Sequence, residues 1–488
     1  MKKSYVLWLI VLLFFVTFLP KGRVENPVTL HALFLSSDYF VSQLDTYPVG
    51  KNNVEMMSKA LLKDTRGYEN VTISSDRVAS KEAFSSLVKT AFSKADENDI
   101  CMFYLSTHGI SNEDAVVFLL SDGENEVAID AKTLKETLDM AKGTKVLLLD
   151  FCHSGAMINK GETRSSKPEP MHFVGDEYKI LTSSQGTQDS WNWNNGKTGE
   201  GAQGGSYFTS ILAQGLTIRQ IMDRNHDKCI TLWEMAKYMQ TYYAPSISCV
   251  YPQEETETVL FAYDAILAQA EHFVSPIYFD KDYFKTPSDQ VHFSFRVNQD
   301  SVLLYQLVYD VDGRWDFANI EHFYDNEGEK LQAGTYHRTL TLSLPKEEAD
   351  KSGYVMLLLF TIDDEGAYHL QASKLFAGLS SKEEMALSIC ADASFSPENG
   401  EELVIDVNHD NACFLTVSVL DEAGETLCYI AYDALTMPNL QNPKGTEFYW
   451  DGKLRDGTFA KKGAYRIKAE THQGEKNFSV QTTPVIVK

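Results

Sequence analysis

Two uninterrupted apolar runs in the first half of the chain end abruptly at polar residues. The run at residues 146–149 ends at Asp150 and Cys152, and the run at residues 100–105 ends shortly before His108. Runs without alternation are typical of strands buried on both faces, which in an α/β domain are parallel strands of a central sheet. Ligands bind outside the carboxyl ends of such strands, so the pattern predicts a His and a Cys at one functional edge.

Helical and strand patterns alternate around these two runs. The expected strands lie at residues 30–35, 71–73, 116–120 and 178–184, with a last strand within residues 251–261. Helical spacing occupies residues 54–62, and further helices are expected from Ser80 to about Ala95, from Asp130 to about Met140 and over residues 206–215. This alternation predicts a mostly parallel sheet flanked by helices over residues 24–265.

From about Pro276 the pattern changes to short strands separated by Gly, Asp and Asn turns. Strands are expected at residues 291–297, 302–308, 336–344 and 355–362. Short strands at such spacing indicate β-sandwiches, which we place at residues 276–378 and 380–488.

The amino terminus carries an export signal. Lys2 and Lys3 precede an apolar run at residues 5–19, and the pattern breaks before residue 24. Residues 1–23 are therefore expected to be a cleaved signal peptide or an uncleaved membrane anchor. Either outcome places the protein outside the cytoplasm, as a secreted or cell-surface protein.

The amino-acid composition limits the kinds of molecule that this protein is expected to bind. The formal net charge of −24 excludes nucleic acid and anionic membrane surfaces as natural ligands, because neither attracts an acidic surface. The seven cysteines are odd in number and scattered, which does not suggest a disulfide framework. Cys413 and Cys428 are the only candidate pair for a disulfide bridge.

The segments FYLSTHG (residues 103–109) and LLLDFCHSG (residues 147–155) resemble the caspase-like cysteine peptidases, a group that includes metacaspases and clostripain-like enzymes. The His precedes the Cys at a separation close to the roughly 50 residues typical of caspases. The resemblance implies a caspase-like α/β domain and a cysteine endopeptidase acting on proteins or peptides. The alternative is a buried thiol and a core histidine, which would not explain a Gly shortly after each.

We therefore predict a catalytic dyad of Cys152 and His108, with no cofactor required. A thiolate is the better nucleophile, and a nearby His favours it or protonates the leaving amine. The backbone N–H groups of Gly109 and Cys152 are the expected oxyanion donors. By resemblance, Asp150 forms the acidic floor of the specificity pocket, which implies cleavage after Arg or Lys. Asn53 stands where the family often carries an Asp, which weakens this basic preference.

The polar segment at residues 156–172 directly follows the predicted nucleophile. It carries Lys160, Arg164 and Lys167, and exposed polar loops are easily nicked. In the caspase-like family a cut in the corresponding linker often accompanies activation, so the resemblance implies self-processing here. The alternative is an inert surface loop.

Residues 223–234 match the ligand spacing of a calcium-binding loop, with Asp223, Asn225, Asp227 and Glu234 as ligands. The sixth position departs from that pattern, because it carries Lys228 where Gly makes the sharp turn without strain. The alternative is a capped helix start, since Asp and Asn also favour helix N-termini.

The carboxyl-terminal segments at residues 448–452, 456–457 and 463–466 resemble the immunoglobulin-like module of flagellar hook-capping proteins. Two other functions remain open at this point: a catalytically silent caspase-like scaffold, and a surface adhesin acting through its β-domains. The sequence leaves the oligomeric state open.

Overall fold

A computed structural model provides the fold. It describes residues 28–38, 49–111, 116–158, 172–173, 175–186, 188–195, 203–218, 222–243, 246–252, 257–264, 277–281, 283–284, 289–311, 314–315, 321–323, 328–342, 353–363, 366–378, 386–410, 413–436, 445–454, 458–473 and 476–488. The expected export segment, residues 1–23, lies outside these ranges. Within them, no helix combines the length and apolar character needed to cross a membrane.

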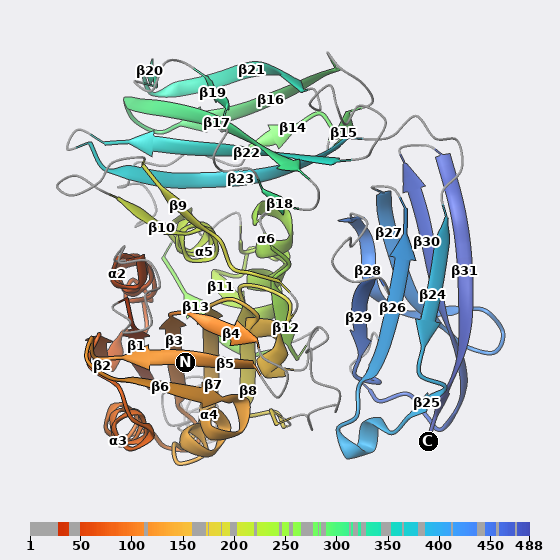
Figure 1. The fold of residues 1–488 in the computed structure, drawn as a ribbon, viewed down its shortest axis with the longest axis horizontal. Coiled ribbons are helices and arrows are strands. Elements are labelled where there is room, and N and C mark those ends of the chain that lie inside the picture. The colour runs from red at the N-terminus through yellow and green to blue at the C-terminus, as the bar shows by residue number, and fades with distance from the viewer. Residues whose placement is uncertain are drawn as a thin grey trace, which may run out of the picture.

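A six-stranded sheet forms the centre of the first domain, in the order β12-β8-β7-β3-β1-β2 (Figure 1). Its strands are β1 (Leu30–Ser36), β2 (Tyr68–Ser75), β3 (Ile100–Ser106), β7 (Thr144–Asp150), β8 (Tyr178–Thr182) and β12 (Cys249–Tyr251). All neighbours are parallel except β12, which runs antiparallel to β8. Every residue of β3 and residues 145–150 of β7 are buried, as the two uninterrupted apolar runs predicted, and β1 is buried along its whole length as well.

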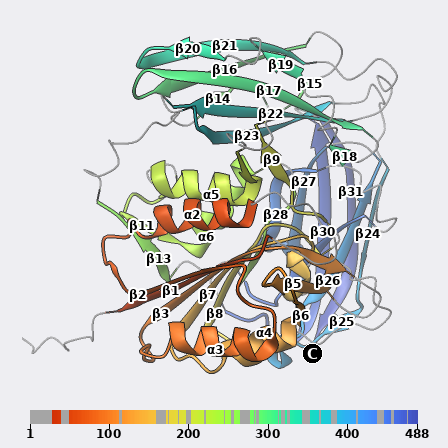
Figure 2. The ribbon, with the colours of Figure 1, turned by 60° about the vertical axis from the view of Figure 1, so that its left-hand side comes forward.

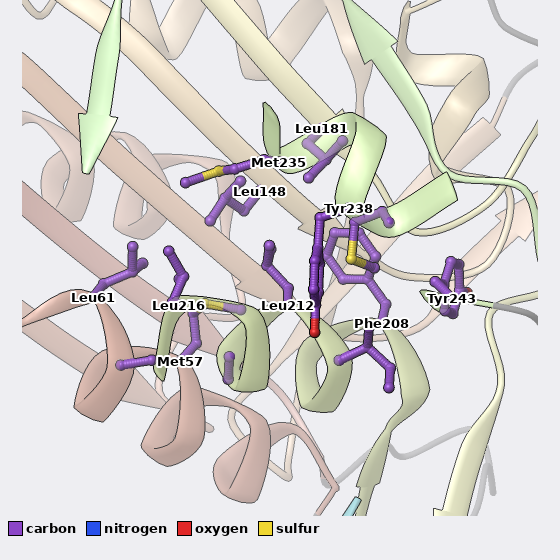
Figure 3. Close-up of a cluster of buried hydrophobic side chains, with 14 of the residues drawn as sticks. Met57, Leu61, Leu148, Leu181, Phe208, Leu212, Leu216, Met235, Tyr238 and Tyr243 are labelled. Carbon is purple, nitrogen blue, oxygen red and sulfur yellow. The ribbon is translucent and has the colours of Figure 1, made fainter. Parts of the chain in front are cut away.

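Helices cover both faces of this sheet (Figure 2). One layer contains α2 (Val49–Leu61), α5 (Tyr207–Ile218) and α6 (Leu232–Tyr242), and the other contains α3 (Lys81–Ala91) and α4 (Ala131–Leu138). Alternate residues of β1 serve the two layers, because Phe34 packs into the first core and Leu35 into the second. Figure 3 shows the first core, where Leu212 of α5 and Met235 of α6 lie near Leu148 of β7.

Short segments outside the central sheet complete the first domain. They are β4 (Gly109–Ser111), β5 (Val116–Ser121), β6 (Glu126–Asp130), η1 (Ser154–Ile158), β9 (Asn192–Asn194), β10 (Gly204–Ser206), β11 (Cys229–Thr231) and β13 (Val259–Ala262). β4, β5 and β6 form their own antiparallel sheet, and β9 pairs with β10. Of the two segments expected to supply the last strand, only β12 joins the central sheet, because β13 pairs with β11.

The first β-sandwich packs a three-stranded sheet against a seven-stranded one. Its strands are β14 (Tyr278–Phe279), β15 (Tyr283–Phe284), β16 (Asp289–Val297), β17 (Ser301–Val311), β18 (Arg314–Trp315), β19 (Glu321–Phe323), β20 (Glu329–Leu331), β21 (Gly334–Leu342), β22 (Gly353–Ile362) and β23 (Tyr368–Gly378). Side chains such as Phe293 and Leu357 from the two inner faces form one buried core.

The second β-sandwich has a three-stranded sheet, a five-stranded sheet and a core centred on Trp450. Its elements are β24 (Leu387–Ala391), β25 (Ser394–Phe395), η4 (Pro397–Asn399), β26 (Leu403–His409), β27 (Cys413–Leu420), β28 (Thr426–Thr436), β29 (Thr446–Trp450), β30 (Gly463–Gln473) and β31 (Lys476–Val487). Cys413 faces Thr436 and Cys428 faces Val419 across the strands. The described residues include all seven cysteines and contain no disulfide, so the considered bridge is wrong.

The first β-sandwich shares a hydrophobic core with the first domain. Strand β22 is buried on both faces: Leu357 and Leu359 point into the sandwich, whereas Leu358 and Phe360 join the core formed by α2, α5 and α6. In Figure 1 the seven-stranded sheet lies directly above α5. The shared core makes this sandwich continuous with the layer of helices beside the predicted site.

Candidate active site

The parallel register of β3 and β7 brings the two predicted catalytic residues to one edge of the sheet. Ser106 is the register partner of Asp150, and the backbone N–H of Thr107 donates to the Asp150 carbonyl oxygen at 3.2 Å. His108 and Cys152 therefore each lie two residues beyond a pair of matched strand ends. His108 is half-buried, and its carbonyl oxygen accepts the N–H of Leu119, which ties it to the sheet of β4 and β5.

Gly109 lies against the backbone of Cys152. A Cβ atom added at Gly109 would overlap the Cys152 carbonyl oxygen and would lie 2.7 Å from Cδ2 of Phe151. Only glycine allows this approach of the two strand-end segments. The two strand-end segments that carry the predicted oxyanion donors, Gly109 and Cys152, are therefore closely packed against each other.

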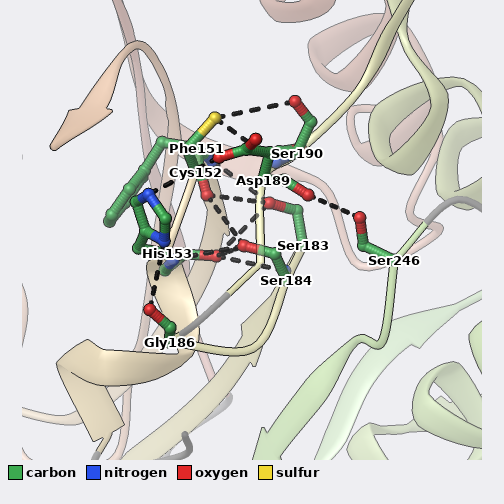
Figure 4. A network of polar contacts seen from close by, with 10 residues as sticks. Phe151, Cys152, His153, Ser183, Ser184, Gly186, Asp189, Ser190 and Ser246 are labelled. Atoms are coloured by element: carbon green, nitrogen blue, oxygen red, sulfur yellow. Dashed lines mark hydrogen bonds and ion pairs between the residues drawn. The ribbon is translucent and has the colours of Figure 1, made fainter. Parts of the chain in front are cut away.

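The thiol of Cys152 is held by the backbone of Ser190 (Figure 4). The Ser190 N–H donates to Sγ at 3.3 Å, and the thiol faces the Ser190 carbonyl oxygen at 3.6 Å. Burial, followed by the negative charge of Asp189, raises the pKa of the Cys152 thiol to about 12, while the Ser190 N–H lowers it. Burial prevails, which favours the neutral thiol over the thiolate.

Asp150 is buried beneath this site and surrounded by hydroxyl groups. Its Oδ2 accepts hydrogen bonds from the hydroxyls of Ser206 and Thr209, the latter at 2.5 Å, and its Oδ1 accepts one from Ser190 Oγ at 3.1 Å. Burial raises the pKa of Asp150, although the same hydroxyl donors lower it. These hydrogen-bond partners of the carboxyl group are all neutral hydroxyl groups.

Asn53 also reaches the site, from helix α2. Its Nδ2 donates to Ser106 Oγ at 2.9 Å, and its Oδ1 accepts the backbone N–H of Ser206 at 2.8 Å. Its side chain is 1% exposed. Asn53 therefore connects the end of β3 with β10, which carries the hydroxyl that contacts Asp150.

Sequence reasoning missed Ser190, Ser206 and Thr209. All three lie in polar or helical segments far from the two motifs in sequence, and single Ser and Thr residues carry no signal of their own. The abundance of small polar residues just before α5 was the only indication available.

A second layer of hydroxyls supports the segment around the nucleophile (Figure 4). The hydroxyls of Ser183 and Ser184 donate to the carbonyl oxygen of Phe151 at 3.2 and 3.3 Å, and Gly155 N–H donates to the Ser184 carbonyl at 2.8 Å. His153 adopts a φ of 64°, the left-handed region, and its ring contacts the Gly186 carbonyl at 3.1 Å. Together these contacts fix the conformation of the turn that carries Cys152.

The twelve-residue loop at residues 223–234 is closed by internal hydrogen bonds. Asp223 accepts the N–H groups of Asp227 and Lys228, at 3.3 and 2.9 Å, and Lys228 adopts a φ of 69°. Thr231 and Glu234 form a capping box at the start of α6.

The side-chain oxygens of the predicted metal ligands thus mainly accept hydrogen bonds from backbone N–H groups. Glu234 accepts the N–H of Arg224 at 2.9 Å, and Asn225 accepts that of Asp227 at 3.0 Å. Among the residues that the structure describes, no group of three or more acidic, His or Cys side chains is arranged to hold a metal ion. Calcium binding at this loop stays a prediction.

The loop expected to be self-processed is only partly described. Residues 154–158 form η1 and are buried, whereas Lys160, Arg164 and Lys167 lie outside the described residues.

Comparisons with known proteins agree with this geometry. Residues 30–242 match the caspase domain family, and this match supports a cysteine peptidase in general. No curated protein sequence matches the chain.

Many solved structures are similar to this chain, and three of them illustrate the low identity. A structural-genomics protein of Geobacter sulfurreducens is 15% identical, with 48% of this chain and 100% of that chain covered and a TM-score of 0.32. Dimeric latent PorU of Porphyromonas gingivalis is 10% identical, with 64% and 29% covered and a TM-score of 0.19. Two fibronectin type III domains of chicken tenascin are 9% identical, with 44% and 100% covered and a TM-score of 0.16.

Proposed function

We propose that this chain, whose residues 30–242 form a caspase-like domain, is an exported cysteine endopeptidase with Cys152 as nucleophile and His108 as its acid–base partner. The observation that supports this most is the matched register of β3 and β7, which ends both motifs at one edge. The close packing of Gly109 on the Cys152 backbone supports the same assignment.

In the proposed reaction, His108 accepts the thiol proton as Sγ of Cys152 attacks the carbonyl carbon of the scissile peptide bond. A C–S bond forms, and the N–H groups of Gly109 and Cys152 donate to the developing oxyanion. The tetrahedral intermediate collapses as the C–N bond breaks and His108 protonates the leaving amine. Water then attacks the thioester, His108 takes one of its protons, and the thiol is restored as the carboxylic acid product leaves.

Because the thiol of Cys152 is neutral at rest, the proposed reaction needs His108 to accept its proton. With a pKa of about 12, Cys152 is only marginally ionised at neutral pH, so proton removal must accompany attack. The Ser190 N–H that donates to Sγ stabilises the thiolate as it forms.

We propose that the enzyme cleaves after Arg or Lys. Asp150 is a buried carboxylate solvated by hydroxyls, and a buried charge is costly unless a cation meets it. A basic substrate side chain would supply that cation. Because Asn53 is neutral, the pocket offers one carboxylate, and the preference should be weaker than with two.

This specificity has a pH dependence. Burial raises the pKa of Asp150, so the carboxylate takes up a proton at a higher pH than an ordinary Asp does. As the pH falls, KM for basic substrates should therefore increase at a higher pH than an ordinary Asp would require, while KM for apolar substrates stays constant.

A fluorogenic peptide library tests the activity. The purified protein should cleave peptides with Arg or Lys before the scissile bond, and Cys152→Ala and His108→Ala should each lose cleavage while keeping the wild-type Tm. Cys390→Ala is the matched control, because it removes an exposed thiol of the second β-sandwich. Activity in the Cys152 or His108 variant would refute the dyad.

The same library tests the alternatives. Absence of cleavage by a folded wild-type protein would favour a silent caspase-like scaffold or an adhesin acting through its β-domains. A profile dominated by Asp or by apolar residues would keep the peptidase and refute the role of Asp150.

A further inference from the structure

One side chain of the caspase-like domain is held by the first β-sandwich through both of its polar atoms. Gln203 directly precedes β10, and its Nε2 donates to the Gly366 carbonyl oxygen at 3.0 Å. Its Oε1 accepts the backbone N–H of Tyr368 at 2.6 Å. Both partners lie at the start of β23, so the amide of Gln203 bonds to the sandwich as a neighbouring strand would.

Gln203 is close in sequence to the floor of the predicted pocket. Strand β10 spans Gly204–Ser206, and Ser206 donates its hydroxyl to Asp150 and its backbone N–H to Asn53. Only two residues, Gly204 and Gly205, therefore separate the anchor on the sandwich from the donor on the acidic floor. A shift of Gln203 would be transmitted along one short strand.

The other strand of the hairpin is anchored in the same way. Trp193 of β9 packs edge-on against Phe360 of β22, with ring centroids 5.2 Å apart. Its indole Nε1 donates to Ser210 Oγ at 2.9 Å, and its side chain is 5% exposed. Trp193 pairs with Gly205 across the hairpin, so both strands are fixed against the sandwich.

The hairpin is also held by helix α2, because Asn52 Nδ2 donates to the Gly204 carbonyl oxygen at 3.1 Å and Asn53 accepts the N–H of Ser206. Its strands have three residues each and pair only with one another. An isolated two-stranded hairpin is marginally stable at best, so its position depends on the surfaces that it contacts. The sandwich supplies one of those surfaces.

We infer that the first β-sandwich is a structural part of the substrate pocket, and that Gln203 is the positioning residue that holds Ser206 against Asp150. This inference rests on the proposed function and adds a specificity-determining contact to it. Gln203 does not touch the reacting atoms. Its effect falls on recognition of the basic side chain, because the adjoining β10 carries Ser206 against Asp150, whereas Cys152 follows β7.

Gln203→Ala tests the inference in the full-length protein. KM for an Arg peptide should increase ~10-fold, as expected for the loss of two hydrogen bonds that position a donor, with kcat within about twofold of wild type. KM for a peptide with Leu before the scissile bond should not change. Gln203→Glu should behave similarly, because a carboxylate cannot donate to the Gly366 carbonyl.

Gln214→Ala is the matched control. Gln214 of α5 donates to Gln371 of β23, so it also joins the two domains, but it does not contact the hairpin. Its KM and kcat should equal those of the wild type.

Three results would overturn the inference. Equal kinetics for wild type and both Gln203 variants would refute it while leaving the peptidase intact. A fall in kcat and Tm together, for Arg and Leu peptides alike, would show a general structural role only. A wild-type protein that is folded yet cleaves no peptide would refute the proposed function and, with it, this inference.

Discussion

The backbone of Gly109 packs directly on the backbone of Cys152, so closely that a Cβ at position 109 would overlap the Cys152 carbonyl oxygen. This packing joins the segment after β3, which carries the predicted acid–base residue, to the segment after β7, which carries the predicted nucleophile. The two segments cannot move independently.

Gly109→Ala should therefore disable the site. The added methyl group must push the two segments apart, and a misplacement of about 1 Å costs on the order of 100-fold in rate. We expect at least that loss in kcat/KM together with a destabilisation of about 1–3 kcal/mol, measured by peptide cleavage and urea unfolding. Gly463→Ala is the control, since its added Cβ would find its nearest neighbour 3.9 Å away. A fully active Gly109→Ala enzyme would contradict the packing.

The reactivity of Cys152 should respond to a neighbouring charge. Asp189 raises the pKa of this thiol, and removing its negative charge favours the thiolate. In Asp189→Asn the rate of alkylation by iodoacetamide at pH 8, followed by mass spectrometry of the Cys152 peptide, should increase several-fold. In the wild type the rate should continue to rise above pH 9, because the pKa lies near 12.

Glu136→Gln on helix α4 controls for loss of an exposed charge, since its side chain is 67% exposed and paired with Lys132. It should leave the alkylation rate unchanged. A plateau of the wild-type rate near neutral pH would show that a thiolate is already present and would contradict the neutral resting state.

Self-processing should occur within the basic segment at residues 156–172. Lys160, Arg164 and Lys167 follow the nucleophile in sequence, and the pocket that we propose prefers such residues. Intact-mass analysis should find fragments ending at one of these residues in the wild type but none in Cys152→Ala. A wild-type chain that stays uncut and is fully active would show that processing is not required.

Thr231 should stabilise the start of α6. Its hydroxyl accepts the N–H of Glu234 at 3.3 Å, and its own N–H donates to the Glu234 carboxylate at 2.9 Å. Thr231→Ala should cost about 1 kcal/mol of unfolding free energy. Thr241→Ala on the same helix is the control, because its exposed hydroxyl bonds only to the Lys237 carbonyl. Equal stability losses in the two variants would count against the cap.

The calcium prediction can be tested on the same samples. An ion bound only by the folded loop raises Tm by mass action. A Tm that does not change with millimolar calcium or with a chelator would leave residues 223–234 as a capped helix start, and a rise in the wild type that is lost in Asp223→Asn would establish the ion site.

One tertiary feature did leave a signal in the sequence. Residues 355–360 are apolar at every position, the pattern of a strand buried on both faces. A strand of a β-sandwich ordinarily buries one face, against the facing sheet. In the structure the second face of this strand packs against the helices of the first domain.

The sequence by itself determined the central sheet and the edge of it that carries both His108 and Cys152. Uninterrupted apolar runs specify parallel buried strands, and parallel strands in register must end together. Only the tertiary structure decided what surrounds Asp150 and Cys152. Ser190, Ser206 and Thr209 lie in segments without hydrophobic periodicity, and their hydroxyls reach Asp150 only because folding closes the β9–β10 hairpin and α5 over the sheet. A hydrogen bond between residues distant in sequence leaves no pattern in the chain, whereas burial of an entire strand does.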